Sequence, residues 1–202
     1  TLWDELARVM IDGGALYYWG FWQDAPWVLA NARRVGLTPL SEIKWWYRTG
    51  RPAATNYRQD TETCWYMSKG IPETFNAEAA LEPYEDAANY ARYGRAGKHP
   101  GTVWLASRVF HNHPENCGHP TQKPLAIIRK IVAVSSNPGD IVLDTHCGSG
   151  TTCVAAQALG RHFIGIERDA VYCEIARSRI DEARRKHQPT LPETVPFSEH
   201  VA

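Results

Sequence analysis

A glycine-rich loop between two short apolar runs is the feature that most constrains the fold of this chain. The loop Asp144–Thr152 reads Asp-Thr-His-Cys-Gly-Ser-Gly-Thr-Thr and directly follows the apolar run Ile141–Leu143. A helix-forming stretch comes next, and a second apolar run, His162–Ile166, ends at Glu167 before another helical stretch. This order predicts a parallel βαβα unit whose loop lies at the carboxyl edge of the sheet.

Such a loop predicts a binding site for a nucleotide-like molecule. Its glycines let the backbone approach a ligand, and the helix that follows presents free N–H groups. Glu167 ends the neighbouring strand, where a carboxylate can accept hydrogen bonds from both hydroxyls of a ribose. The alternative is a tight turn with a capping acid.

Three classes of ligand compete for the loop. An ATP-binding P-loop requires Gly-Lys-Ser/Thr, but no lysine follows Gly150. A dinucleotide site favours a third glycine, and Cys153 occupies that place. S-Adenosylmethionine has no phosphate, so one glycine turn suffices, and Asp144 suits its ammonium group.

The rest of the chain divides into two halves of different composition. All eight Trp lie between Trp3 and Trp104, whereas the stretch 121–186 is rich in Ile, Val, Ala and Arg. Apolar periodicity, with Asp24, Thr121 and Asp169 as capping residues, predicts helices over Leu2–Ile11, Asp24–Val35, Thr121–Ser136, Thr151–Leu159 and Asp169–Lys186. Further strands are predicted over Ala15–Trp19, Leu40–Tyr47, Thr61–Met67 and Thr102–Ala106, with the turn-rich stretch Gly70–Gly101 before the last.

Composition excludes several classes of protein. Lys plus Arg and Asp plus Glu each total 22, so the net charge is zero and any polyanion must meet a local patch. The five cysteines are scattered and contain no Cys-x-x-Cys, which indicates free thiols in a reducing cytosol. No apolar run approaches the roughly 20 residues of a membrane span. We expect a soluble, cytoplasmic protein without a membrane partner.

The block His119-Pro120-Thr121-Gln122-Lys123-Pro124 stands directly before the helix that precedes the glycine-rich loop. With this block, the chain resembles the amino-group DNA methyltransferases that modify adenine N6 or cytosine N4, in their permuted β-class arrangement. That family has His-Pro-Thr-Gln-Lys-Pro, a helix, a strand into Asp-Pro-Phe-x-Gly-Ser-Gly-Thr-Thr, and then Gly-Ile-Glu. The resemblance covers residues 119 to about 182, and weaker likeness runs upstream through Ala7–Leu16 and Glu62–Gly70.

The resemblance implies an α/β, Rossmann-like S-adenosylmethionine-dependent methyltransferase fold in circularly permuted motif order. Its sheet would be mixed and would contain an antiparallel aromatic hairpin. One domain is expected over residues 1–186, with the target-base side in 1–106 and the cofactor side in 119–186. Residues 70–118 are a candidate DNA-recognition insertion, and 187–202 are expected to form a flexible tail.

The resemblance also implies roles in binding S-adenosylmethionine. Asp144 and the loop would hold the methionine part, Glu167 would take the ribose hydroxyls, and Thr121–Pro124 would close over the cofactor. Thr145 and His146 stand where the family has Pro and Phe, and His146 is expected to pack against the cofactor. The implied cofactor-binding residues are Asp144, His146, Cys147, Gly148, Ser149, Gly150, Thr151, Glu167, Thr121, Gln122, Lys123 and Pro124.

The family's base-gripping tetrapeptide, Asp-Pro-Pro-Tyr or Ser-Pro-Pro-Tyr, does not occur in these 202 residues. In the permuted order it belongs upstream of Leu2, so the catalytic residues are expected before Thr1. The nearest sequence, Glu82-Pro83-Tyr84, lies in the turn-rich stretch rather than after a strand.

A local basic patch is the expected contact with DNA. Between residues 33 and 58, six basic residues oppose the single acid Glu42, a local charge of plus five. Basic and aromatic residues alternate here, which suits an extruded base and its backbone, although a solvated charged face is the ordinary alternative. The predicted DNA-binding residues are Arg48, Arg51, Arg58, Trp45 and Trp46.

Four potential metal ligands lie within nine residues, at His111, His113, Cys117 and His119. One arm of chain rarely supplies all four tetrahedral ligands without strain. We therefore predict a polar loop and no metal.

The sequence thus predicts a bacterial, archaeal or phage DNA methyltransferase of the kind found in restriction-modification systems. The first alternative is a catalytically silent subunit that binds cofactor and DNA, because the tetrapeptide is missing. The second, a dinucleotide-dependent oxidoreductase, is disfavoured by the missing third glycine and by the Lys123 block. The choice of adenine or cytosine, the recognition sequence and the oligomeric state stay open.

Overall fold

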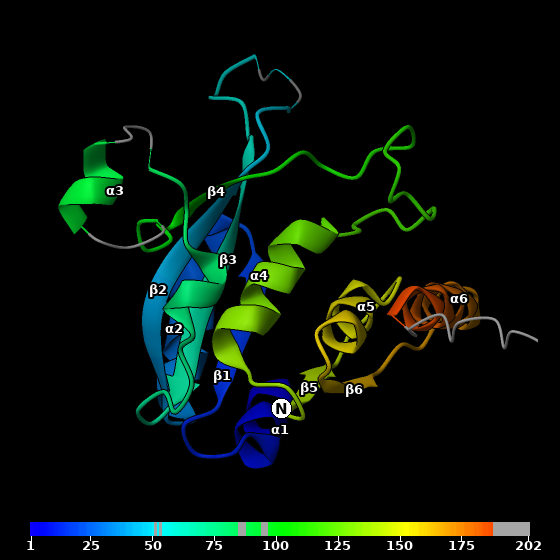
Figure 1. Cartoon of the computed structure of the whole chain (residues 1–202). Helices are drawn as coiled ribbons and strands as arrows, with labels where there is room; N and C mark the ends of the chain where they lie inside the picture. Colours follow the sequence, from blue (N-terminus) through cyan, green and yellow to red (C-terminus); the bar gives the residue numbers. More distant parts are fainter. Residues whose placement is uncertain (51, 53, 85–87, 94–96, 188–202) are drawn as a thin grey trace, which may run out of the picture.

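The computed structural model describes residues 1–50, 52, 54–84, 88–93 and 97–187 (Figure 1). Within these residues the strands form two sheets. The larger sheet contains, in spatial order, β1 (Ala15–Gly20), β3 (Thr61–Lys69), β2 (Leu37–Trp46) and β4 (Val103–Leu105). β3 runs antiparallel to both of its neighbours, whereas β4 runs parallel to β2. The predicted mixed sheet with an antiparallel aromatic hairpin is therefore confirmed.

The second sheet is the parallel pair β5 (Ile141–Asp144) and β6 (His162–Gly165). It alternates with α5 (Thr151–Ala158) and α6 (Ala170–His187), as the βαβα prediction requires. The remaining helices are α1 (Leu2–Val9), α2 (Ala25–Arg34), α3 (Ala88–Tyr93), α4 (Leu125–Ser135) and the short 3-10 turns η1 (Trp22–Asp24) and η2 (Ala77–Ala80).

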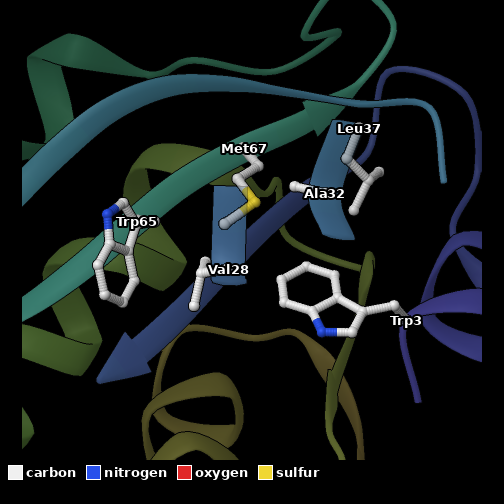
Figure 2. Close-up of a cluster of buried hydrophobic side chains, with 6 residues drawn as sticks. All are labelled: Trp3, Val28, Ala32, Leu37, Trp65 and Met67. Atoms are coloured by element: carbon white, nitrogen blue, oxygen red, sulfur yellow. The ribbon is translucent and has the colours of Figure 1, made fainter. Parts of the chain in front are cut away.

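β3 is the buried centre of the larger sheet, and its alternate side chains point to opposite faces. Trp65 and Met67 face α1 and α2, where they join a cluster of buried apolar side chains. Figure 2 shows this cluster: Trp3, Val28, Ala32, Leu37, Trp65 and Met67. Burial of the apolar faces of two amphipathic helices on one side of the sheet fixes the register of the strands.

α4 joins the two sheets. Its Ile131 packs with Trp19 and Trp104 on the other face of the larger sheet. Its Ile128 and Val132 pack against Ala155 of α5. Figure 1 shows α4 standing between the larger sheet and the β5–β6 unit. The position of this helix therefore sets how the two halves of the chain meet.

The β5–β6 pair has one apolar face open to solvent, which we call the open face. Val142 on the opposite face packs into the cluster formed with α4 and α5. The open face carries Leu143 beside its register partner Ile164, and the exposed fractions are 39% and 52%. Ile141 and Ile166 extend it, at 68% and 53% exposed.

Two element boundaries and one capping interaction differ from the sequence prediction. α4 begins at Leu125 rather than at Thr121, because Pro124 has extended backbone angles and is itself the N-cap. Asp24 is at the N-cap position of α2, as predicted, but its side chain makes no capping hydrogen bond there; its carboxylate accepts a hydrogen bond from the N–H of Phe21 and closes η1. β2 begins at Leu37 and passes Pro39 at an irregularity in the ladder, where a missing N–H is tolerated.

Other boundary predictions hold. The carboxylate of Asp169 accepts hydrogen bonds from the N–H groups of Val171 and Tyr172, so this residue caps α6 as predicted. The predicted tail 187–202 lies outside the described residues apart from His187, which ends α6. Among the described helices, none is both long and apolar enough to cross a membrane.

Candidate functional site

The glycine-rich loop forms a tight turn between β5 and α5. Cys147 donates its N–H to the carbonyl of Ile166 at 2.9 Å, which ties the loop to the end of β6. Gly150 then donates to the carbonyl of Cys147 at 2.7 Å and closes the turn. Gly148 and Gly150 have φ values of 50° and 76°, in the left-handed region that favours glycine. The turn leaves the N-terminus of α5 at the carboxyl edge of the β5–β6 sheet.

Glu167 closes the other side of this edge. One oxygen of its carboxylate accepts hydrogen bonds from the N–H groups of Arg168 and Asp169, at 2.8 and 2.9 Å. The other oxygen accepts from the N–H of Gly148 at 3.0 Å. These backbone donors, with that of Asp169 foremost, lower the pKa of Glu167, so the side chain is a carboxylate at neutral pH. Its remaining lone pairs can accept hydrogen bonds from a ligand.

Asp144 lies at the end of β5, and its carboxylate accepts a hydrogen bond from the N–H of His146 at 3.1 Å. The His146 ring is exposed, and its Nδ1 lies 3.0 Å from the hydroxyl of Thr145. Two thiols belong to this region, that of Cys147 in the loop and that of Cys153 in α5. Burial raises the pKa of Cys147 and raises that of Cys153 to about 12, so both are neutral thiols.

α6 supports the loop from behind. Arg179 donates hydrogen bonds to the carbonyl and hydroxyl oxygens of Ser149 and to the hydroxyl of Thr151. A Cβ atom on Gly150 would lie 2.7 Å from the Cβ of Ala176, so the backbone of the loop and α6 are in close contact. Ser149 and Thr151 are only 3% and 5% exposed. The loop is thus a fixed part of the fold.

His119 also lies against the loop, at Gly148. A Cβ on Gly148 would lie 2.7 Å from the Nε2 atom of His119. The His119 ring also packs edge-on against the ring of Tyr172, with 4.4 Å between the two ring centres. Burial lowers the pKa of His119, although the charge of Glu167 opposes this shift. The neutral ring accepts a hydrogen bond from the N–H of Thr121 at Nδ1, which leaves its proton on Nε2.

The residues after His119 take different directions. Thr121 is exposed, and Pro124 caps α4. The amide of Gln122, 6% exposed, bonds to Glu115 and Cys117 and so holds the preceding loop. The ammonium of Lys123 pairs with Glu62 of β3.

The structure therefore brings together only part of the predicted cofactor set. Asp144, the loop up to Thr151 and Glu167 share one edge, and His119 closes on them. Gln122 and Lys123 are engaged with other partners. Sequence reasoning did not place His119, Arg179 or Ala176 at the loop, because their contacts are long-range and leave no local pattern.

A basic and aromatic cluster forms at the turn end of the β2–β3 hairpin, where the chain passes from β2 to β3. The guanidinium of Arg48 lies 4.9 Å from the centre of the Trp46 ring. The indole N–H of Trp46 donates to Asp60, which also pairs with Arg58 at 3.3 Å. Arg108 lies over Tyr47 and Phe110, and it adds a third exposed guanidinium.

Trp45 corrects one prediction. It is only 2% exposed, and its indole N–H donates to the carbonyl of Ala106, so this ring is a core residue and not a platform for a base. Trp46 is the exposed neighbour. Arg51, also predicted to bind DNA, lies outside the described residues.

Two further features of the sequence were considered as functional sites, the Glu-Pro-Tyr sequence and the stretch with three His and one Cys. Glu82 of the Glu-Pro-Tyr sequence forms an ion pair with Lys130 of α4 and a backbone β-bridge with Lys98. In the part of the chain that the structure describes, no group of three His, Cys, Asp or Glu side chains is arranged to hold a metal ion.

Comparison with known sequences gives consistent matches. A family model described as DNA methylase (N6_N4_Mtase) matches residues 1–178. The chain is similar to the DNA adenine methyltransferase YhdJ of Escherichia coli (strain K12), with 35% identity over 190 residues, 89% of this chain and 64% of the relative. It is also similar to the type II methyltransferase M.BglII of Bacillus subtilis, with 34% identity over 195 residues, 86% of this chain and 53% of the relative. The chain thus spans between about half and two thirds of the length of these curated relatives.

Solved structures are similar as well. The M1.HpyAVI–SAM complex matches with a TM-score of 0.69 and 26% identity, over 89% of this chain and 80% of that one. The cytosine-N4-specific PvuII DNA methyltransferase matches with a TM-score of 0.69 over 91% of this chain and 73% of that one, at 15% identity, a likeness of fold alone. The predicted Rossmann-like α/β fold is therefore confirmed, and the circular permutation stays a prediction.

Proposed function

Because this chain belongs to the N6/N4 family of DNA methylases, we propose that it forms the cofactor-binding part of an enzyme that methylates adenine N6 or cytosine N4 in DNA. S-Adenosylmethionine is the proposed methyl donor. The observation that carries the proposal is the shared edge at which Asp144, the glycine turn and Glu167 meet.

The donor set at this edge fits S-adenosylmethionine. Asp144 supplies a carboxylate for the ammonium of the methionine part, and Glu167 is an ionised acceptor for the ribose hydroxyls. Gly148 and Gly150 allow close approach of the backbone, and no lysine follows Gly150 as it would in a P-loop that binds phosphates. When bound, the cofactor would supply an electrophilic methyl group on its sulfonium.

The protein's contribution is to position the two reactants. Arg179 contacts the loop at Ser149 and His119 lies against it at Gly148, so the proposed cofactor-binding edge is organised before binding. When reactants are held in a fixed geometry, their loss of translational and rotational entropy occurs on binding and not in the reaction step. The activation barrier of that step is therefore lower.

We propose that the groups holding the target base are supplied by polypeptide outside these residues. The Asp/Ser-Pro-Pro-Tyr tetrapeptide is absent from residues 1–202, and Glu82, of the sequence Glu82-Pro83-Tyr84, forms an ion pair with Lys130 and a backbone β-bridge with Lys98. In the described residues β1 pairs only with β3 and β5 only with β6. Each therefore has one edge with which a further strand could pair.

DNA is the proposed partner, and the cluster at the end of the β2–β3 hairpin is the proposed contact. Arg48, Arg58 and Arg108 are exposed there, beside the ring of Trp46. Guanidinium groups bind phosphates, and an exposed indole can stack on an unpaired base.

Calorimetry with the purified 202-residue chain tests the choice of cofactor. S-Adenosylmethionine should bind, and NADH should not, because Cys153 stands where a dinucleotide site has its third glycine. Glu167→Ala should weaken the binding of S-adenosylmethionine, and the control Glu174→Ala, on the exposed side of α6, should not. This difference would assign cofactor binding to the edge that contains Glu167. NADH binding as tight as that of S-adenosylmethionine would contradict the methyltransferase proposal and favour an oxidoreductase.

A further inference from the structure

Glu62 and Lys123 form an ion pair between the two halves of the chain. The Nζ atom of Lys123 lies 2.9 Å from a carboxylate oxygen of Glu62, and the two side chains are 20% and 15% exposed. Glu62 is at the start of β3, whereas Lys123 precedes α4. Partial exclusion of water strengthens the attraction and makes an unpaired charge costly at either position.

Two indole rings enclose the ammonium group. Lys123 lies 5.4 Å from the centre of the Trp19 ring and 5.9 Å from that of Trp45. Both rings belong to the larger sheet, and Trp45 is fixed by its hydrogen bond to Ala106. The position of Lys123 is therefore set by a charge and two ring faces.

The segment His119–Pro124 is consequently anchored at both ends. At one end, His119 packs on Gly148 and Tyr172 of the cofactor side. At the other end, Lys123 is held by the larger sheet. The segment thus links the loop to the sheet across the junction that α4 spans.

We propose that Glu62 and Lys123 are a positioning pair, which holds the segment His119–Pro124 against the cofactor loop and thereby raises affinity for S-adenosylmethionine without contacting it. This inference rests on the proposed function. It differs from the role predicted from sequence, in which Lys123 itself closes over the cofactor.

A second pair in the same protein provides a matched control. Lys130 pairs with Glu82 at 3.0 Å, with side chains 21% and 33% exposed, and lies 4.7 Å from the centre of the Trp104 ring. The chemistry and burial are thus similar to those of Glu62 and Lys123. This pair does not involve the segment that packs on the loop.

The experiment measures the dissociation constant for S-adenosylmethionine by calorimetry, and the thermal midpoint, for variants of the 202-residue chain. We expect Lys123→Met and Glu62→Gln each to weaken binding about tenfold, and the double variant to bind about as the single variants do, because one interaction is lost in all three. Lys123→Arg keeps the charge and should stay close to wild type. Lys130→Met and Glu82→Gln should lower the thermal midpoint by a similar amount and leave the dissociation constant unchanged.

Three results would overturn the inference while leaving the proposed function intact. The first is wild-type affinity in folded Glu62→Gln and Lys123→Met. The second is a double variant whose loss equals the product of the two single losses, since the two residues would then act independently. The third is an equal loss of affinity in the Lys130 and Glu82 controls, which would indicate general destabilisation. A wild-type chain that binds no S-adenosylmethionine overturns the proposed function and this role together.

Discussion

Arg179 donates a 2.6 Å hydrogen bond to the carbonyl oxygen of Ser149, a residue 30 positions earlier in the chain. The same nitrogen lies 3.1 Å from the hydroxyls of Ser149 and Thr151. One side chain of α6 therefore serves three oxygen atoms of the glycine-rich turn. The turn depends for its shape on a helix that follows it in the sequence.

Replacing Arg179 by Ala should destabilise the protein and loosen the loop. Three oxygen atoms of two buried residues lose a charged donor, so the free energy of unfolding should fall by about 1.5 to 3 kcal/mol. Urea denaturation measures this loss, and the affinity for S-adenosylmethionine should weaken with it. Arg177→Ala removes an exposed arginine of the same helix and should change neither; equal effects of the two variants would contradict the assignment.

Removing the carboxylate of Glu167 should weaken cofactor binding. Glu167→Ala is expected to cost about 1.5 to 3 kcal/mol in binding, the range for hydrogen bonds to a charged acceptor. Because backbone donors lower the pKa of Glu167, binding through this residue should persist as the pH falls to about 5. Calorimetry at pH 7 and pH 5 tests both statements. A folded variant with unchanged affinity would remove Glu167 from the site.

His119 should make stability depend on pH. Burial lowers its pKa in the folded state, so the unfolded chain binds a proton more readily. Its contribution to stability is therefore complete above the ordinary histidine pKa of about 6.5 and is lost as the pH falls through the lower folded value. His119→Asn should reduce the fall in thermal midpoint between pH 7 and pH 5. Parallel pH curves for wild type and His119→Asn would disprove this role.

The arginines at the end of the β2–β3 hairpin should contribute to DNA binding through phosphates. Arg48→Ala and Arg58→Ala should each weaken binding to a duplex and reduce the salt dependence of log K by about 1. Fluorescence anisotropy over a series of salt concentrations measures both quantities. Arg8→Ala, on α1, provides the control. Identical salt slopes in all three variants and the wild type would locate the DNA elsewhere.

The 202-residue chain alone should not methylate DNA, although it should bind the cofactor. Without the groups that hold the target base, positioning worth up to about 7 to 11 kcal/mol in favourable cases is largely lost. The assay compares this chain with a version extended upstream, using tritiated S-adenosylmethionine and unmethylated DNA, and identifies the methylated base by mass spectrometry. Transfer by the short chain at the rate of the extended one would show that other residues hold the base.

Local patterns in the sequence were sufficient for the parts of the fold that depend on neighbouring residues. The β5–α5–β6 order and the cap at Asp169 follow from short-range rules, and the structure has both. Thr121 failed as a helix cap because Pro124, three residues later, keeps the chain extended. A threonine that could cap a helix therefore predicts the wrong helix start when a proline follows within three residues.

Side-chain roles that depend on distant partners could not be predicted. Trp45 and Trp46 are adjacent in sequence and identical in type, yet one is buried against Ala106 and the other is exposed beside Arg48. Alternation along a strand predicts that they face opposite sides, but not which side is covered. In the same way, only the fold shows that Lys123 meets Glu62.

The open face of the β5–β6 pair has a consequence for handling the protein. Four aliphatic side chains, Ile141, Leu143, Ile164 and Ile166, are exposed on a chain whose net charge at pH 7 is zero. Hydrophobic contacts between molecules are then not opposed by long-range electrostatic repulsion. Colloidal stability is therefore lowest near neutral pH. Concentrated stocks at pH 7 will tend to precipitate, and a buffer well away from neutral pH should keep them clear.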